Sequence, residues 1–216
     1  MTGEADIRIV VLGDSITKGD QVGEAKRFTT LVQKELSERL GQKIEVINAG
    51  VNADVTELAR HRLQRDVFAH KPNYAVIMFG VNDAGFYRPE TPERPGHTTR
   101  VAAEGYRRYL NEMADKIEAA GIKVIFATPV PMSRHYWLAH LPQYQKHGLN
   151  YIVDEYAKIM RDVAEERGAP MIDVHREFSI RPQTGDFIPD GIHPDRRGHR
   201  IIADVYIQSL MNILAE

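Results

Sequence analysis

Four short polar segments of the sequence carry residue types that can act together on a carbonyl group. Ser15 lies just past a short apolar run near the N-terminus. The polar segments 48–53 and 80–83 follow two further apolar runs, and the segment 190–194 precedes the last helical pattern. A serine hydroxyl is a poor nucleophile until a base takes its proton. The chemistry of Ser15 therefore depends on whether the fold brings a base to it.

His193 can serve as that base, because a neutral imidazole is available near pH 7. Asp190 lies three residues earlier in a glycine-containing turn. Its carboxylate can accept a hydrogen bond from the ring Nδ1–H, which fixes the tautomer and stabilises the imidazolium as it forms. Attack on a carbonyl carbon creates an oxyanion that needs hydrogen-bond donors already in place. The Asn82 amide and the main-chain N–H groups near Ser15 and Ala53 can supply them.

Each of these residues also has a simpler structural interpretation. Serine is a favoured N-cap, so Ser15 could do no more than begin a helix. Asp190 and His193 could be loop residues that cap the final helix. Asn82 could be a turn residue in a left-handed conformation. The interpretation depends on whether the four residues meet in space.

The elements that would bring them together are strands alternating with helices. Short apolar runs rich in β-branched residues predict buried strands, and apolar residues at helical spacing predict helices between them. Such alternation predicts a mostly parallel sheet covered on both faces. The predicted strands are 7–12, 43–47, 74–79, 122–127 and 170–174, and the predicted helices are 28–40, 55–68, 99–120, 149–167 and 197–214.

This topology predicts where the chemistry takes place. If the strands are parallel, the first three polar segments share the carboxyl edge of the sheet, and the fourth can fold back over it. Two connections, 84–97 and 129–148, are longer than a minimal fold needs, and long loops often form pocket walls. With 216 residues and no internal repeat or linker, we expect one domain spanning 1–216.

The composition limits the kinds of partner that we expect the protein to bind. A net charge of −2 gives no electrostatic reason to bind nucleic acid, and no apolar run is long enough for a membrane span. Residues 1–6 lack the basic and apolar regions of a signal peptide, so we expect a cytoplasmic protein, although a secreted mature form would have the same pattern. The sequence leaves the oligomeric state open, a homo-oligomer included.

No metal or cofactor is predicted. The sequence has no cysteine, which excludes thiolate nucleophiles and cysteine zinc sites. A metal site built from Asp190, His193, Asp195 and His199 matches none of the usual zinc spacings.

Three motifs together resemble those of the SGNH hydrolases, also called the GDSL esterase/lipase family. They read Gly-Asp-Ser-Ile at 13–16, Gly-Val-Asn-Asp at 80–83 and Asp-Gly-Ile-His at 190–193. The order and spacing also fit, and the resemblance spans residues 7 to about 214. The run 65–74 is most similar to the single-domain carbohydrate acetylesterases of this family. The Gly-x-Ser-x-Gly elbow of the α/β-hydrolases is absent at Ser15.

The resemblance implies a flavodoxin-like three-layer α/β/α sandwich with a five-stranded parallel sheet. It implies Ser15 as nucleophile, His193 as base and Asp190 as its orienting carboxylate. Asn82 and the Ser15 main-chain N–H would serve the oxyanion hole. The family usually adds the second glycine N–H of an Asn-x-Gly-x-x-Gly pattern, where this sequence has an alanine. Ala53 is therefore the predicted third donor, with Gly50 as the fallback.

We accordingly predict a serine carboxylic-ester hydrolase that acts through an acyl-enzyme without a cofactor. Aromatic and polar side chains are mixed in the two long loops, which favours a short acyl group, acetyl above all, on a sugar-like or other polar alcohol. One alternative is a thioesterase or lysophospholipase for longer acyl chains. Another is a catalytically inactive carbohydrate-binding protein on the same fold. The candidate pocket residues are Asp14, Asn52, Val81, Tyr87 and Ile192.

Overall fold

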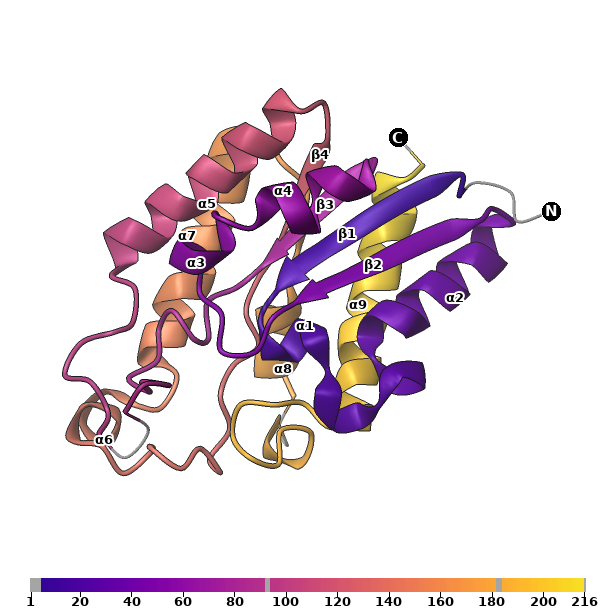
Figure 1. The fold of residues 1–216 in the computed structure, drawn as a ribbon. Coiled ribbons are helices and arrows are strands. Elements are labelled where there is room, and N and C mark those ends of the chain that lie inside the picture. The colour runs from indigo at the N-terminus through magenta and orange to yellow at the C-terminus, as the bar shows by residue number, and fades with distance from the viewer. Residues whose placement is uncertain (1–4, 92–93, 182–183, 216) are drawn as a thin grey trace.

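The computed structural model of the chain describes residues 5–91, 94–181 and 184–215, which form a parallel sheet between two layers of helices (Figure 1). The strand order is β2-β1-β3-β4-β5, and every neighbouring pair is parallel. The predicted flavodoxin-like sandwich with five parallel strands is thereby confirmed. The strands are β1 (Ile7–Gly13), β2 (Ile44–Gly50), β3 (Tyr74–Met78), β4 (Lys123–Ala127) and β5 (Met171–Ile172).

The long helices cover the two faces of the sheet. α2 (Phe28–Leu40) and α9 (Arg196–Ile213) pack together on one face, and α5 (Ala103–Ala119) and α7 (Tyr151–Arg167) pack together on the other (Figure 1). The shorter elements are α1 (Ser15–Lys18), η1 (Asp20–Val22), η2 (Glu24–Lys26), α3 (Thr56–Ala59), α4 (Leu63–Asp66), η3 (Phe68–His70), α6 (Pro142–His147), α8 (Val174–Ser179) and η4 (Thr184–Asp186).

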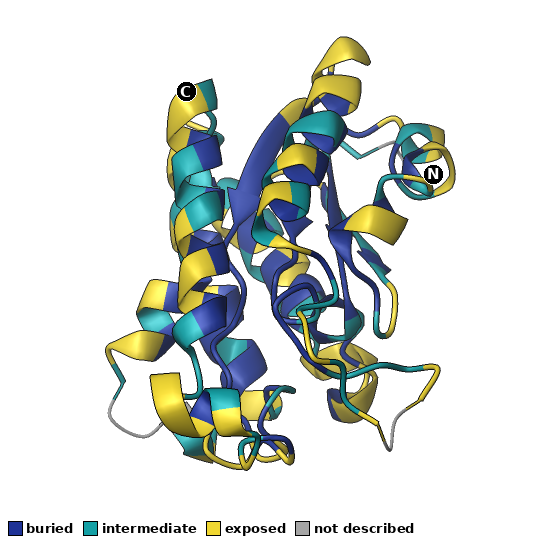
Figure 2. Cartoon of the chain, turned by 90° about the vertical axis from the view of Figure 1, so that its left-hand side faces the viewer, coloured by how far each residue is buried: buried dark blue, intermediate teal, exposed yellow. Residues whose placement is uncertain are grey.

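The central strands are buried on both faces. Ile9, Val10, Val11 and Leu12 of β1 are all at most 1% exposed. A strand with helices above and below it needs apolar side chains in both directions, which is why this segment reads as an unbroken apolar run. The helices turn their buried sides to the sheet and their exposed sides to solvent (Figure 2).

The helix predicted over 55–68 is interrupted. It forms α3, α4 and η3 instead of one continuous helix. Arg62, which lies between α3 and α4, has φ −107° and ψ 8°, outside the helical region. Its guanidinium turns back toward the ends of β1 and β2. Leu63 and Val67 are buried as the spacing predicts, whereas Leu58 is 55% exposed.

Several other boundaries differ from the prediction by a few residues, and β2 runs three residues past the predicted end, to Gly50. The strand predicted over 170–174 ends at Ile172, because Asp173 caps α8 by accepting a hydrogen bond from the Arg176 N–H. α5 begins later than the predicted residue 99. None of these differences changes the order of the elements.

The loops that follow the strands gather at the carboxyl edge of the sheet, in the lower part of Figure 1. β1 lies between β2 and β3, so the strand order reverses beside it. Open α/β sheets bind their ligands at such a switch point. The long connection 129–148 contains α6, and residues 92–93 of the connection 84–97 lie outside the described ranges. No helix in the described part of the chain could cross a membrane.

Candidate active site

Ser15 lies at the switch point, in the first turn of α1. The N-cap of this helix is Asp14, whose Oδ1 accepts a hydrogen bond from the Ile16 N–H at 2.9 Å. The capping role that the sequence allows for Ser15 therefore belongs to its neighbour. The Ser15 hydroxyl is left to face a different partner, and its Oγ lies 2.9 Å from Nε2 of His193.

The tight turn from β1 into α1 depends on Gly13. A Cβ at this position would lie 2.1 Å from Oγ1 of Thr17 and 2.9 Å from the Met78 carbonyl oxygen. Both distances are shorter than real Cβ contacts, so a larger residue would displace the turn that carries Ser15. Glycine is the residue type that permits such a close approach.

His193 and Asp190 extend the contact made by Ser15 into a chain of side-chain hydrogen bonds. Nδ1 of His193 lies 2.7 Å from Oδ2 of Asp190. The other carboxylate oxygen accepts hydrogen bonds from the main-chain N–H groups of Ile192 and His193. A ring that accepts from a hydroxyl at Nε2 and donates to a carboxylate carries its proton on Nδ1. The geometry is therefore that of a general base oriented by a carboxylate.

The surrounding charges raise the pKa of His193. Burial alone would lower this pKa, but the hydrogen bond and charge of Asp190, with a smaller contribution from the charge of Asp14, outweigh burial. Burial in turn favours a raised pKa for Asp190, but the His193 ring and the two main-chain N–H groups bring it down to about 2. Asp190 is thus ionised at neutral pH, and His193 is a stronger base than a free imidazole.

The loop that carries His193 packs against the long connection 129–148. Gly191 has φ +95°, and a Cβ there would lie 2.2 Å from the main-chain N and Cα of Tyr136. The Gly191 carbonyl accepts a hydrogen bond from the Ser133 N–H at 2.9 Å. The long connection therefore helps to fix the position of His193 over the edge of the sheet.

The three residues predicted to donate hydrogen bonds to an oxyanion lie around one cavity. Ser15, Ala53 and Asn82 line the same cavity as His193. Within the described residues, the main-chain N–H groups of Ser15 and Ala53 have no hydrogen-bond partner. Nδ2 of Asn82 donates one hydrogen to the Asp54 carbonyl oxygen at 3.1 Å, which leaves its second hydrogen for a ligand.

Ala53 stands where the family usually has the second glycine of the Asn-x-Gly-x-x-Gly pattern. Ala53 has φ +57°, in the left-handed region that glycine usually occupies. The Gly50 N–H, the fallback donor, is already engaged, because it donates to Oδ1 of Asn48 at 3.0 Å. Gly50 is therefore less available as a donor, and Ala53 stays the predicted donor of this motif.

A cavity of about 780 Å³ opens at this edge of the sheet. Of the five predicted pocket residues, Asn52, Tyr87 and Ile192 line it. Asp14 and Val81 do not, and each is only 3% exposed. The Asp14 side chain turns inward to cap α1, and the Val81 side chain belongs to the hydrophobic core.

Three further residues that the sequence did not single out for the pocket line the cavity: Asp20, Gln21 and Trp137. Trp137 is half exposed, and its ring meets the Tyr87 ring edge to face, with centroids 5.8 Å apart. Asp20 accepts a hydrogen bond from Nδ2 of Asn52 at 3.2 Å. A single tryptophan in a long loop was the available signal for Trp137, whereas nothing in the sequence distinguishes Asp20 or Gln21.

Two buried carboxylates lie behind the serine. Asp14 and Asp83 are both almost fully buried, and burial raises the pKa of Asp14 to about 7 and that of Asp83 to about 6. The charge of Asp83 adds to the shift at Asp14. Oδ1 of Asp83 accepts hydrogen bonds from the main chain and the hydroxyl of Thr56, at 2.9 and 2.5 Å. These bonds join the Asn82 loop to the start of α3.

The other two residues of the hypothetical metal set have structural roles. Asp195 caps α9 by accepting hydrogen bonds from main-chain N–H groups in its first turn. His199 is fully buried, and its Nδ1 accepts a hydrogen bond from the Phe28 N–H at 3.2 Å. Burial, with a smaller effect of the charge on Arg27, lowers the pKa of His199 to about 4. Among the described residues, no acidic or histidine side chains are grouped to hold a metal ion.

Known proteins resemble this chain along most of its length. It is 28% identical to an uncharacterized lipoprotein, YqeF, from Bacillus subtilis, over 90% of this chain and 85% of that protein. It is 25% identical to an acetylxylan esterase from Xylanibacter ruminicola, over 94% of this chain but only 42% of that protein. The solved structure of a lipase/acylhydrolase from Enterococcus faecalis matches with a TM-score of 0.77 and 26% identity, covering 96% of each chain.

Because YqeF is named a lipoprotein, the compartment expected from the sequence stays a prediction. The profile of the GDSL-like Lipase/Acylhydrolase family matches residues 11–201. That range contains all the motifs whose side chains converge on the cavity beside Ser15. The chain therefore belongs to the GDSL-like lipase/acylhydrolase family and is a carboxylic-ester hydrolase.

Proposed function

We propose that Ser15 is the nucleophile of this esterase, that His193 is its base and that Asp190 orients the base. Oγ of Ser15 attacks the ester carbonyl carbon while Nε2 of His193 takes the hydroxyl proton. Asp190 keeps the ring in the Nδ1–H tautomer and stabilises the imidazolium. The observation that supports these roles is the continuous chain of contacts, 2.9 Å from Ser15 to His193 and 2.7 Å from His193 to Asp190.

The carbonyl oxygen becomes an oxyanion in this step. The main-chain N–H groups of Ser15 and Ala53 and the free Nδ2 hydrogen of Asn82 donate to it. When the tetrahedral intermediate collapses, His193 gives its proton to the leaving alcohol, and the acyl group remains on Ser15. His193 then deprotonates a water molecule, which attacks the acyl-enzyme and releases the acid.

A serine substitution with a matched control tests the mechanism. Ser15→Ala should lower kcat for p-nitrophenyl acetate on the order of 10⁴- to 10⁶-fold. Ser179 is a control of the same residue type, because it also contacts a histidine that contacts an aspartate: Oγ lies 3.3 Å from His175, whose ring lies 2.9 Å from Asp154. Ser179 does not line the cavity, so Ser179→Ala should retain activity. Full activity in Ser15→Ala would overturn the mechanism.

We infer that the substrate carries a short acyl group, acetyl above all, on a sugar-like or other polar alcohol. The cavity wall combines hydrogen-bonding side chains, Asp20 and Asn52, with the paired rings of Tyr87 and Trp137. Polar groups beside an aromatic face suit a ligand that has both hydroxyl groups and apolar C–H surfaces. The resemblance to a protein named acetylxylan esterase supports the same substrate class.

The acyl preference is tested with p-nitrophenyl esters of increasing length. We expect kcat/KM to fall steadily from the acetate to the octanoate. A rise along this series would favour the alternative, a thioesterase or lysophospholipase for longer chains. Labelling of Ser15 by a fluorophosphonate addresses the other alternative, an inactive carbohydrate-binding protein, because an unactivated serine would stay unlabelled.

The alcohol preference is tested at Trp137. Trp137→Ala should raise KM for an acetylated xylo-oligosaccharide about 2- to 13-fold, on the order of 0.5–1.5 kcal/mol of lost ring contact. It should change the KM for p-nitrophenyl acetate much less, since that alcohol is small. Equal changes for both substrates would contradict a sugar contact at this ring.

A further inference from the structure

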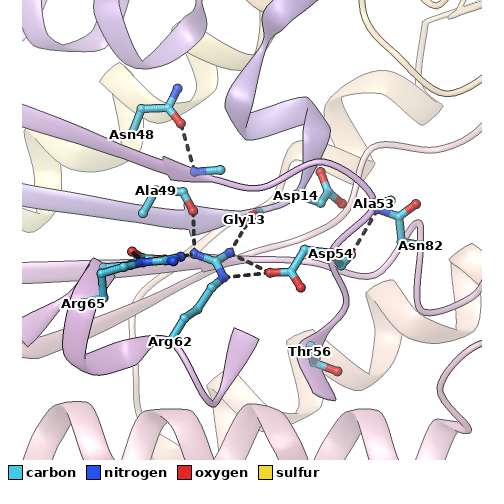
Figure 3. A network of polar contacts seen from close by, with 12 residues as sticks. Gly13, Asp14, Asn48, Ala49, Ala53, Asp54, Thr56, Arg62, Arg65 and Asn82 are labelled. Carbon is cyan, nitrogen blue, oxygen red and sulfur yellow. Dashed lines mark hydrogen bonds and ion pairs between the residues drawn. The ribbon is translucent and has the colours of Figure 1, made fainter. Parts of the chain in front are cut away.

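Arg62 is largely buried and makes hydrogen bonds to four residues from different parts of the chain. Its side chain is 11% exposed. Nη2 donates to the Gly13 carbonyl oxygen and Nη1 to that of Ala49, both at 2.9 Å. Nε donates to Oδ2 of Asp54 at 2.8 Å, and Nη1 donates to Asp66 at 2.6 Å. Figure 3 shows the guanidinium between the ends of β1 and β2 and the Asp54 carboxylate.

The first of these bonds reaches the segment that carries Ser15. Gly13 is the last residue of β1 and is paired with Gly50 of β2. This is the last pair of the ladder, and the Gly13 carbonyl oxygen accepts from the Val51 N–H and from Arg62. Arg62 therefore continues the connection between β1 and β2 where the strand ladder ends.

The bond to Asp54 reaches the other proposed oxyanion donors. Asp54 directly follows Ala53, and its carbonyl oxygen accepts from Nδ2 of Asn82 at 3.1 Å. Its side chain is 4% exposed and is held by Arg62. The Ala53 carbonyl oxygen accepts from Arg100 at 2.8 Å. Movement of Asp54 would thus shift the Ala53 peptide and the Asn82 amide together (Figure 3).

We propose that Arg62 is a positioning residue that holds the oxyanion donors in register with Ser15. The inference rests on the proposed function of Ser15, Ala53 and Asn82. Arg62 does not line the cavity, so it acts through Gly13 and Asp54. Oxyanion donors must be placed before the reaction to be effective, and a displacement of about 1 Å at a reacting group can cost about 10²-fold in rate.

If Arg62 formed only a structural ion pair, we would expect a different result. A buried ion pair of that kind would lower stability when broken and leave the chemistry of the folded fraction unchanged. A positioning residue lowers kcat of the folded enzyme with little effect on KM, because the donors act mainly on the transition state. The pKa that controls activity should also stay in place, since His193 and Asp190 are not contacted by Arg62.

The test compares Arg62→Gln with Arg65→Gln. Arg65 is the matched control, because it also binds Asp66, at 2.5 and 2.9 Å, but is 71% exposed and does not contact Gly13, Ala49 or Asp54. At a temperature where circular dichroism shows both variants folded, we expect kcat for p-nitrophenyl acetate to fall about 10²-fold in Arg62→Gln. It should stay within about twofold of wild type in Arg65→Gln.

A double-mutant cycle with Asn82→Ala shows whether the loss passes through the oxyanion donors. If Arg62 positions Asn82 and Ala53, the loss in Arg62→Gln/Asn82→Ala is smaller than the product of the two single losses. A full product, or an undiminished kcat in Arg62→Gln, overturns the inference. If Arg62→Gln does not fold, Arg62→Lys takes its place in the cycle with the same criteria, because lysine keeps the charge but lacks the planar fork that spans both carbonyls and Asp54.

The experiments distinguish a failure of the proposed function from a failure of the inference about Arg62 alone. An active Ser15→Ala would remove the proposed function together with this inference. An inactive Ser15→Ala combined with a fully active Arg62→Gln would leave the proposed function in place and overturn the positioning role alone.

Discussion

Nδ1 of His193 lies 2.7 Å from Oδ2 of Asp190, and this contact helps to raise the pKa of the ring that we propose as the base. The carboxylate, with its pKa lowered to about 2, is ionised under all ordinary assay conditions. Its charge and hydrogen bond outweigh burial and raise the pKa of His193 above the usual 6.5. A raised pKa means that the ring is protonated, and so inactive as a base, up to a higher pH than a free imidazole.

The first prediction is therefore an acid limb in the pH profile. We expect kcat/KM for p-nitrophenyl acetate to fall as the pH drops through a value above 6.5, because only neutral His193 can accept the Ser15 proton. In Asp190→Asn the limb should move to lower pH, and kcat should fall on the order of 10⁴-fold because the tautomer is no longer fixed. Initial rates across the pH range give both values. An inflection in the wild type below 6.5 would contradict the assignment of His193.

The second prediction concerns the buried carboxyl of Asp14. Its pKa is raised from 3.8 to about 7 by burial, so the folded protein holds this proton more tightly than the unfolded chain. This contribution to stability is complete below about pH 4 and is lost as the pH rises to about 7. Asp14→Asn keeps an oxygen for the Ile16 N–H but cannot ionise. It should be more stable than wild type at pH 8, by up to about 4 kcal/mol.

Urea unfolding of both proteins at pH 5 and at pH 8 measures the effect of Asp14→Asn. The difference in the free energy of unfolding between variant and wild type should be larger at pH 8 than at pH 5. A difference that is the same at both pH values would show that Asp14 does not change its charge in this range.

The parallel sheet and the convergence of the main site residues could both be predicted from the sequence. Unbroken apolar runs separated by helical patterns require a parallel sheet, and the direction of parallel strands puts their carboxyl ends at one edge. Ser15 and Asn82 lie within a few residues of strand ends, so the topology accounts for their proximity. His193 follows no strand, and its place over the same edge depends on the packing of Gly191 against Tyr136.

The remaining features depend on backbone angles and on contacts between distant segments. Arg62 lies in a stretch whose apolar residues have helical spacing. This spacing does not indicate the break in the helix that turns the Arg62 guanidinium toward Gly13. Asp14 lies next to Ser15 in the chain, but its side chain turns into the protein and not into the cavity. Trp137 meets Tyr87 only because two long loops pack together.

The third prediction contrasts His199 with the candidate base. Burial, followed by the charge on Arg27, lowers the pKa of His199 to about 4, so the unfolded chain binds this proton more readily than the folded protein. Stability should therefore fall as the pH drops from about 6.5 to about 4, by about 3 kcal/mol from this residue. His199→Asn keeps an acceptor for the Phe28 N–H. It should lower stability at pH 7 through lost packing but flatten the loss between pH 7 and pH 4.

The check for His199 is the free energy of unfolding of wild type and His199→Asn at several pH values. Parallel curves would exclude the titration of His199 as a cause of acid sensitivity. The variant should also keep the inflection of the kcat/KM profile, because the ring of His193 makes its hydrogen bonds to Ser15 and Asp190 and not to His199.

The fourth prediction uses the left-handed backbone of Ala53. Its φ of +57° strains a residue with a Cβ, and Lys71, an exposed residue far from the cavity lining, has a similar φ of +46°. Replacement of either residue by glycine should raise the free energy of unfolding by up to about 1 kcal/mol, because the strain is relieved. Replacement by valine should lower it by a similar amount or more, since β-branched residues tolerate this region least.

The kcat values of the valine variants should distinguish Ala53 from Lys71. In Ala53→Val the strained peptide should turn its N–H away from the oxyanion position, so kcat should fall on the order of 10²-fold with little change in KM. In Lys71→Val the same strain should leave kcat unchanged, because no proposed donor lies nearby. Thermal or urea unfolding supplies the stability values, and p-nitrophenyl acetate supplies the rates. Equal kcat values in the two valine variants would show that the Ala53 N–H does not take part in the reaction.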